Sequence, residues 1–535
     1  MIGRAGFSSK YWRVLRWAGL AAAAPALWAC TSRTLEAPNI TPTASLTTKF
    51  TQKINNQLDI LFMVDNSSSM KEMQQKLYDQ LPQFMDVLQG LPTPPSLHVA
   101  VVSSDMGAPG DSTSSIMCTR SGDSGQFQSQ ARGTCNGTTL AQGATFISDA
   151  DNMPNFTNPI ASVFQCIALL GDTGCGFENQ LASIDRALGG DGQLPSTNAN
   201  FLRKDAYLGI VILTNEDDCS APANTTVYSL NVGGSNQQNV ANALGPIANY
   251  RCNQWGHLCT DPGSGQVMMP PLQPPADHQT TGTTPTLDMT SCMSNDTGSG
   301  LLTPVSQFVS DIKLLKDMPD DQILVAAIAA PATPYTVAWL PASGGQNTQP
   351  GEVWPVIEHS CGAKGGDDVN PEAPPAQNTT DGSFGDPGVR IAQFVNGFHN
   401  SVLASICDAS YRSSMTAIAT KLGQLITPPC ITGTLQKDAA GLPMCSVIEH
   451  LTDSSGVKKD IALQNCATSG ANPAQCWTLA SGGMGCANGA QLTVTDTVNA
   501  NPQSENSDVN CSICLAGAAI AGCPCITGKE VPGCL

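Results

Sequence analysis

Three oxygen-bearing side chains alternate in the segment Val64-Asp65-Asn66-Ser67-Ser68-Ser69-Met70. Asp65, Ser67 and Ser69 could together bind a hard divalent cation, because an aspartate and two hydroxyls supply one charge and two neutral oxygen ligands. The low charge of this set would leave the cation able to attract an acidic group of a partner. The simpler alternative is that Asp65 or Ser67 only caps a following helix.

The neighbouring sequence gives this segment a defined place in a fold. An apolar run at 58–64 predicts a buried parallel strand directly before it. Apolar residues at helical spacing follow it, with an expected kink at Pro82. The segment would therefore lie at the carboxyl end of a strand, where open sheets bind ligands.

This D-x-S-x-S pattern, in this position, resembles the first segment of the metal-ion-dependent adhesion site of von Willebrand factor A (vWA) domains. The resemblance extends over residues 56–427. It implies a bound Mg²⁺ or Ca²⁺ and a protein or surface macromolecule as partner, whose carboxylate would complete the coordination of the cation.

The other two segments of the family pattern are altered. Glu178 stands where the family has a threonine, ahead of Ala187-Leu188, and Asn215 aligns with the aspartate of the family's Thr-Asp-Gly segment. Glu216 and Asp217 follow in the same turn. The resemblance thus implies a variant ligand set, and its carboxylates favour Ca²⁺ over Mg²⁺: Asp65, Ser67, Ser69, Glu178, Asn215, Glu216 and Asp217.

Strands alternate with helices over residues 56–427, which predicts a doubly wound α/β fold with a mostly parallel sheet. The expected further strands are 97–102, 208–213, 323–328 and 402–406, with a short edge strand at 146–147. The expected further helices are 180–188, ended by Gly189, one opening at Thr303-Pro304, one at Asp386-Pro387, and one from Tyr411 to Leu425.

Three long insertions interrupt this pattern, near 106–155, 219–300 and 331–385, and we expect them to be loops. From 428 to 535 the chain is rich in cysteine and poor in long apolar runs. Short strands expected at 446–448, 477–480 and 492–494 make this a small disulfide-rich β domain.

The N-terminus predicts export. Basic residues precede an apolar run at 17–29, which is too short for a membrane span of about 20 residues but typical of a signal peptide. Leu27-Trp28-Ala29-Cys30 resembles the lipobox of bacterial lipoproteins. That resemblance implies a signal peptide at 1–29, lipidation of Cys30, a tether at 30–55 and anchoring to a bacterial membrane, in the outer membrane or at the cell surface. The alternative is an ordinary signal peptide with Cys30 in a disulfide.

An exported chain with 21 cysteines is expected to form disulfides rather than zinc sites. Cys175 and Cys219 should lie on the same face of the sheet, beside the proposed cation. Local pairing of Cys166 with Cys175, or of Cys252 with Cys259, is an alternative, because sequence does not determine connectivity.

Charge and motifs limit the remaining functions. A net charge of −18 argues against nucleic-acid binding, which needs clustered basic residues. Gly122-Asp123-Ser124-Gly125 matches the nucleophile segment of trypsin-like proteases, but no histidine stands in that family's histidine motif. Adhesion-type binding without enzymatic activity is the leading hypothesis. A metal-independent envelope scaffold is the second, and an exported hydrolase using Ser124 is the third.

Overall fold

The computed structural model describes the chain in segments: residues 45–48, 56–91, 94–108, 118–130, 140–150, 153–229, 244–246, 250–276, 285–341, 353–362, 383–427, 430–452, 457–481, 486, 489–496, 498, 504–514, 519–525, 527–528 and 532–535. The expected signal peptide, Cys30 and most of the tether therefore lie outside the described residues. In the part of the chain that is described, no helix combines the length and apolarity needed to cross a membrane.

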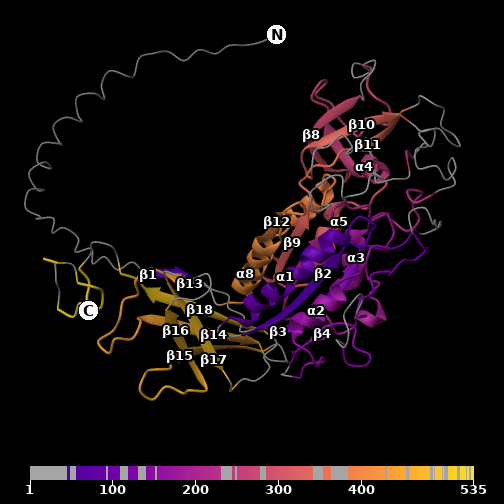
Figure 1. The fold of residues 1–535 in the computed structure, drawn as a ribbon. Helices are drawn as coiled ribbons and strands as arrows, with labels where there is room; N and C mark the ends of the chain where they lie inside the picture. The colour runs from indigo at the N-terminus through magenta and orange to yellow at the C-terminus, as the bar shows by residue number, and fades with distance from the viewer. Residues whose placement is uncertain are drawn as a thin grey trace, which may run out of the picture. The chain divides into compact units, whose positions relative to one another are not determined.

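A six-stranded sheet in the order β12-β9-β5-β2-β3-β4 forms the centre of the α/β part (Figure 1). Five strands are parallel, and the short edge strand β4 pairs antiparallel with β3. The strands expected from the apolar runs are all present. Their bounds are β2 Gln57–Val64, β3 Ser96–Ser103, β4 Ile147–Ser148, β5 Tyr207–Leu213, β9 Ile323–Ala329 and β12 Asn400–Ser405.

Helices pack against both faces of this sheet. Apolar side chains of α1, α2 and α8 share one core cluster with alternate strand residues such as Phe62, and those of α3, α5 and α7 share a second cluster with residues such as Leu61. Helix α1 continues through Pro82. Helix α2 follows the first insertion in the sequence and was not expected. The bounds are α1 Lys71–Gln89, α2 Ile160–Ala168, α3 Gln180–Leu188, α5 Val305–Lys313, α6 Pro319–Gln322, α7 Val389–Asn396 and α8 Arg412–Ile426, with a 3₁₀ turn η2 at Ser196–Asn198.

A second, antiparallel sheet occupies two of the segments that the sequence predicted to be loops. Its order is β11-β10-β8-β6-β7, and Tyr250, Tyr335 and Trp339 are buried in its own apolar cluster. The prediction of structureless insertions was therefore wrong at 219–300 and 331–385. The elements are α4 Tyr250–Gly256, β6 His257–Thr260, β7 Val267–Met268, β8 Thr286–Ser294, β10 Tyr335–Pro341 and β11 Val353–Ile357.

The chain divides into two compact units, one comprising Met1–Thr47, Thr434–Cys445 and Asn510–Leu535 and the other Thr48–Gly433 and Ser446–Val509. In the C-terminal region, strands pair in the order β14-β15-β16-β17-β13. The three short strands expected there are present as parts of longer ones. The bounds are β1 Ser45–Thr48, β13 Cys430–Thr432, β14 Cys445–Thr452, β15 Lys458–Asn465, β16 Gln475–Ser481, β17 Gly489–Asp496 and β18 Ser504–Ser512.

Disulfides cross-link both the insertions and the C-terminal region. Cys175 is bonded to Cys118, Cys252 to Cys219, and Cys259 to Cys292. The local pairs Cys166–Cys175 and Cys252–Cys259 are therefore wrong, although Cys166 is itself disulfide-bonded. The remaining described pairs are Cys361–Cys407, Cys445–Cys511, Cys466–Cys476, Cys514–Cys523 and Cys525–Cys534. Such density of disulfides is typical of exported proteins.

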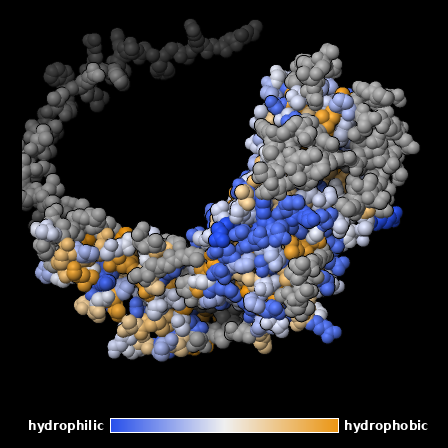
Figure 2. All heavy atoms as spheres, viewed as in Figure 1, coloured by the Kyte–Doolittle hydropathy of each residue, from blue (hydrophilic) through white to orange (hydrophobic). Residues whose placement is uncertain are grey.

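The surface of the α/β part shows which helix faces are exposed to solvent. A continuous hydrophilic area covers helices α1 and α8 in the α/β part (Figure 2). The solvent side of α1 carries charged residues, whereas its other side, with Leu77 and Phe84, is buried. The amphipathic spacing seen in the sequence thus becomes an inner and an outer helix face.

Candidate functional site

The turn between β2 and α1 is fixed by hydrogen bonds to Asp65, which is completely buried. One carboxylate oxygen of Asp65 accepts from the backbone N–H of Ser67 and from Ser104 Oγ, both at 2.9 Å. The other oxygen accepts from Thr214 Oγ1 at 2.7 Å. Gln74 Nε2 donates to the backbone oxygen of Asp65 at 2.7 Å. These contacts join the carboxyl ends of three neighbouring parallel strands.

The two serines of the motif lie together and connect to the third segment. Ser67 Oγ and Ser69 Oγ are 3.4 Å apart, and Ser69 Oγ donates to Asn215 Oδ1 at 3.2 Å. The Nδ2 group of Asn215 is buried and has no hydrogen-bond partner among the described residues. The structure therefore brings Asp65, Ser67, Ser69 and Asn215 into one group.

The carboxyl groups of Glu178 and Glu216 lie beside this group and interact with each other. Burial, together with the charges of Glu216 and Asp65, raises the pKa of Glu178 well above its usual range. Burial and the charges of Asp386 and Asp65 raise the pKa of Glu216 to about 8. Burial also raises the pKa of Asp65. Three carboxyl groups thus share one site and disfavour each other's ionisation.

Asp217 does not join these carboxyl groups. Its side chain accepts hydrogen bonds from His257 Nε2 at 2.7 Å and from the backbone N–H groups of Arg390 and Ile391 at the start of α7. Burial alone would raise the pKa of Asp217, but His257, together with the α7 backbone and Arg390, holds it below its usual value. Asp217 was predicted as a ligand, but it connects β5 to the second sheet and to α7.

Asp218 has a similar supporting role. One of its oxygens accepts from Arg390 Nε at 3.1 Å and Nη2 at 2.9 Å, and the other accepts from the backbone N–H of Leu181 at 2.9 Å. Both members of the Asp218–Arg390 ion pair are fully buried. This pair fixes the beginnings of α3 and α7, and so the segment that carries Glu178.

Sequence reasoning missed Ser104, Thr214 and Gln180. Gln180 Nε2 donates to Thr214 Oγ1 at 2.9 Å, so these side chains orient Asp65 through Thr214. Ser104 directly follows β3, which neighbours β2 in the sheet. The available signal was position, because polar residues after adjacent parallel strands meet at the same sheet edge.

The residues present fit a hard divalent cation only as a mixed set of carboxylates and hydroxyls. Among the described residues, no three carboxylate, imidazole or thiolate side chains are placed to hold a metal by themselves. Asp65, Ser67, Ser69, Glu178 and Glu216 supply oxygen ligands of the kind that Ca²⁺ and Mg²⁺ prefer. A cation here would therefore depend on the two serine hydroxyls.

The protease-like segment has a different geometry from a nucleophile. Ser124 Oγ donates to the backbone oxygen of Ser121 at 2.6 Å rather than to an imidazole. The carboxylate of neighbouring Asp123 accepts from Ser103 Oγ at 2.6 Å. This loop is held by internal hydrogen bonds, and these contacts do not form a Ser-His-acid arrangement.

No family model matches the chain, and no curated protein matches it. Among solved structures, it is similar to the pilus adhesin SpaC from Lactobacillus rhamnosus GG in its open conformation, with 10% identity, a TM-score of 0.26 and coverage of 89% of this chain and 41% of that one. It is also similar to a von Willebrand factor type A structure from Catenulispora acidiphila, with 8% identity, a TM-score of 0.24 and coverage of 87% and 60%.

A third similar structure holds three N-terminal domains of the type V pili tip protein Mfa5 from Porphyromonas gingivalis, with 12% identity, a TM-score of 0.21 and coverage of 88% and 63%. The chain covers less than two thirds of each of these three structures. TM-scores this low carry no argument about fold or function, so the site must be interpreted from its own geometry.

Proposed function

We propose that this protein is a lipid-anchored cell-envelope protein that binds another protein or a surface macromolecule through a divalent cation. The cation is held at the carboxyl end of a vWA-type, doubly wound sheet. Asp65, Ser67 and Ser69 bind it, with Glu178 and Glu216 beside them and Asn215 bonded to Ser69.

The observation that carries this proposal is the convergence of four chain segments on one group of oxygens. Asp65 accepts hydrogen bonds from Thr214 and Ser104, and Ser69 donates one to Asn215. The carboxyl groups of Glu178 and Glu216 interact with each other beside them. Carboxyl groups buried this close together are unfavourable when ionised. A bound cation would supply the compensating positive charge and attract an acidic group of the partner.

The residues of this chain have separate tasks in that role. Ser104 and Thr214 orient the carboxylate of Asp65, and Asp218 with Arg390 fixes the α3 start that carries Glu178. Neither task requires the cation, so the ligands are positioned before binding. Such positioning reduces the ordering cost of binding.

Calorimetric titration of the oxidised, EDTA-treated chain with CaCl₂ and with MgCl₂ tests the proposal. We expect saturable binding of at least one cation and a matching rise in melting temperature. The variants Ser69→Ala and Glu178→Gln should each weaken binding by about tenfold or more, since each removes one ligand. They are preferable to Asp65→Ala, because Asp65 also holds the turn together.

Asp86→Asn is the matched control, because it removes an exposed carboxylate of α1. It should leave cation affinity unchanged. If neither cation binds the parent protein, or if Ser69→Ala binds as tightly as the parent, the cation-dependent function is wrong.

The interaction between the carboxyl groups of Glu178 and Glu216 favours one alternative. A protonated carboxyl group that donates to its neighbour satisfies the pair without metal. The protein would then be a metal-independent envelope scaffold, and the same titration separates the two functions.

A further inference from the structure

Strand β12 is one edge strand of the six-stranded sheet, and β4 is the edge strand at the opposite side. It pairs with β9 on one side, and on its other side no strand within the described residues pairs with it. Most of its residues are half-buried, and Leu403 is 47% exposed. An edge of this kind can pair with another extended chain.

The alternation of the ladder identifies which main-chain groups of β12 face outward. The N–H of Ile406 donates to Ala329 O at 3.0 Å. The main-chain N–H and C=O groups of the even-numbered residues of β12 therefore point toward β9, and those of the odd-numbered residues point away from it. Lys421 Nζ donates to Ser401 O at 3.1 Å from the other side. The N–H and C=O of Leu403 therefore point away from β9, and no described residue forms a hydrogen bond with them.

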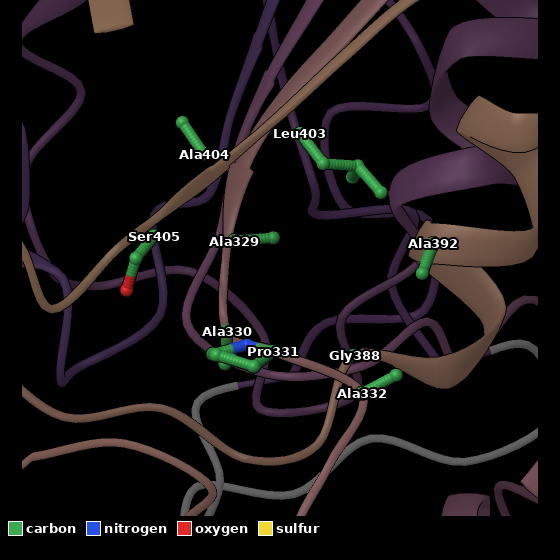
Figure 3. A pocket seen from close by; sticks show the side chains of 9 residues that line it. All are labelled: Ala329, Ala330, Pro331, Ala332, Gly388, Ala392, Leu403, Ala404 and Ser405. Carbon is green, nitrogen blue, oxygen red and sulfur yellow. The ribbon is translucent and has the colours of Figure 1, made fainter. Parts of the chain in front are cut away.

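An apolar cavity of about 220 Å³ opens beside the same residue (Figure 3). Small side chains leave this space between β12, the end of β9 and α7. The lining residues are Ala329, Ala330, Pro331, Ala332, Gly388, Ala392, Leu403, Ala404 and Ser405. An apolar cavity of about 150 Å³ accommodates a benzene ring. The volume beside Leu403 therefore suits one large apolar side chain and is small for a cofactor.

The two features lie on the same side of the strand. Val402 and Ala404 pack against the core that contains α1 and α8, so Leu403 is on the opposite face, toward α7. A strand added beside β12 would place every second side chain on that face, next to Leu403. Main-chain pairing and occupation of the cavity are thus compatible within one extended segment.

A tightly packed chain segment lies between the cavity and the candidate cation site. Asp386 N donates to Asn215 O at 2.8 Å, and Gly388, two residues further on, lines the cavity. A Cβ atom on Gly385 would lie 2.5 Å from Ala330 Cβ and 3.1 Å from Asn215 O, so this connection is close-packed.

We propose that β12 binds an extended segment of a partner protein by strand addition, with a large apolar side chain of that segment in the cavity beside Leu403. This inference specifies the kind of partner for the binding function proposed above. It rests on that function, because the partner is taken to be a protein. Main-chain hydrogen bonds supply the affinity, and the cavity supplies the selectivity.

Fluorescence polarisation with labelled peptides tests this on the full oxidised chain. The probes are a short peptide of alternating threonine and valine with a central phenylalanine, and the same peptide with a central aspartate. We expect saturable binding of the first and at least tenfold weaker binding of the second. EDTA should have no effect, which separates this inference from failure of the cation site.

Two variants address the two features separately. Leu403→Pro removes the outward N–H without breaking a bond to β9, because proline is tolerated where the N–H faces solvent. It should weaken binding of the phenylalanine peptide at least tenfold, whereas Leu403→Ile, its matched control, should not. Ala392→Met fills the cavity and should reduce the preference for phenylalanine over aspartate.

Absence of saturable binding to the parent chain would overturn the proposal, and so would equal binding by Leu403→Pro when its melting temperature is unchanged. If Leu403→Pro does not fold, Ala392→Met decides, and an unaltered preference for phenylalanine in that variant overturns the proposal. Peptide binding that disappears in EDTA also overturns it, because the peptide would then occupy the cation site.

Discussion

Replacing Glu216 with glutamine should make the stability of the cation-free protein less dependent on pH. In the folded chain, burial and neighbouring carboxylates raise the pKa of Glu216 from 4.5 to about 8. Between these two values the folded state binds more protons than the unfolded state, so the free energy of unfolding falls as pH rises. Glu216→Gln removes this titration.

The magnitude follows from the two pKa values. A rise from 4.5 to about 8 corresponds to a loss of at most about 5 kcal/mol between pH 4 and pH 9. Domains are typically stable by about 5–15 kcal/mol, so even a third of this loss is measurable. The divalent cation proposed above would bind the ionised carboxylates, and its addition should restore most of the stability at pH 9.

The assay is thermal melting followed by circular dichroism from pH 4 to pH 9, with EDTA and with CaCl₂. In EDTA the parent chain should melt at lower temperature as pH rises, and Glu216→Gln should melt higher than the parent at pH 9 and close to it at pH 4. Asp86→Asn should follow the parent. If the parent's melting temperature in EDTA does not fall between pH 5 and pH 8, the buried carboxyl pair described above is not present.

Three further changes have defined outcomes. Asp185 is only 3% exposed, and burial with the nearby charges of Asp311 and Asp191 raises its pKa to about 7. Asp185→Asn should therefore raise the melting temperature at pH 8 but not at pH 4. Equal shifts at the two pH values would contradict this prediction. Arg390→Met leaves Asp218 buried without its counter-ion and should lower the unfolding free energy by about 3–5 kcal/mol in denaturant titration; a loss under about 1 kcal/mol would show that the pair is not structural. Phe62→Ala should cost about 3–5 kcal/mol, because the ring is buried against other aromatic rings, whereas Leu314→Ala, at a side chain 79% exposed, should change stability by less than about 0.5 kcal/mol.

The central sheet was predictable because its strands are nearly continuous apolar runs. Segments such as 58–64 and 208–213 are buried on both faces, and this burial favours apolar residues at nearly every position. The exception in 58–64 is Asp59, whose buried carboxylate is paired with Arg203. The antiparallel sheet was missed for the converse reason. Residues Thr286–Ser294 mix exposed polar and buried apolar positions, and their pairing with β10 and β6 depends on contacts distant in sequence.

Only part of the candidate site was predictable from the sequence. The positions of Asp65, Ser67 and Ser69 relative to one another were predictable, because a strand-to-helix turn brings these side chains together. In the third segment, Glu216 lies at the site whereas Asp217 is turned to His257 and α7. The sequence contains no local signal for this division, because the partners of Asp217 come from an insertion and from a helix far along the chain.

The disulfides beside the site determine when it can form in the life of the protein. Cys118–Cys175 closes a loop of 57 residues just before Glu178, and Cys219–Cys252 anchors the segment after Asp218. In a reducing compartment these four cysteines remain thiols, and the loops lose the constraint that the cross-links supply. These cross-linked loops lead into the segments that carry the carboxyl groups, so we expect the site to be fixed only after oxidation. Under the function proposed above, binding would therefore be gained only after oxidation of these four cysteines.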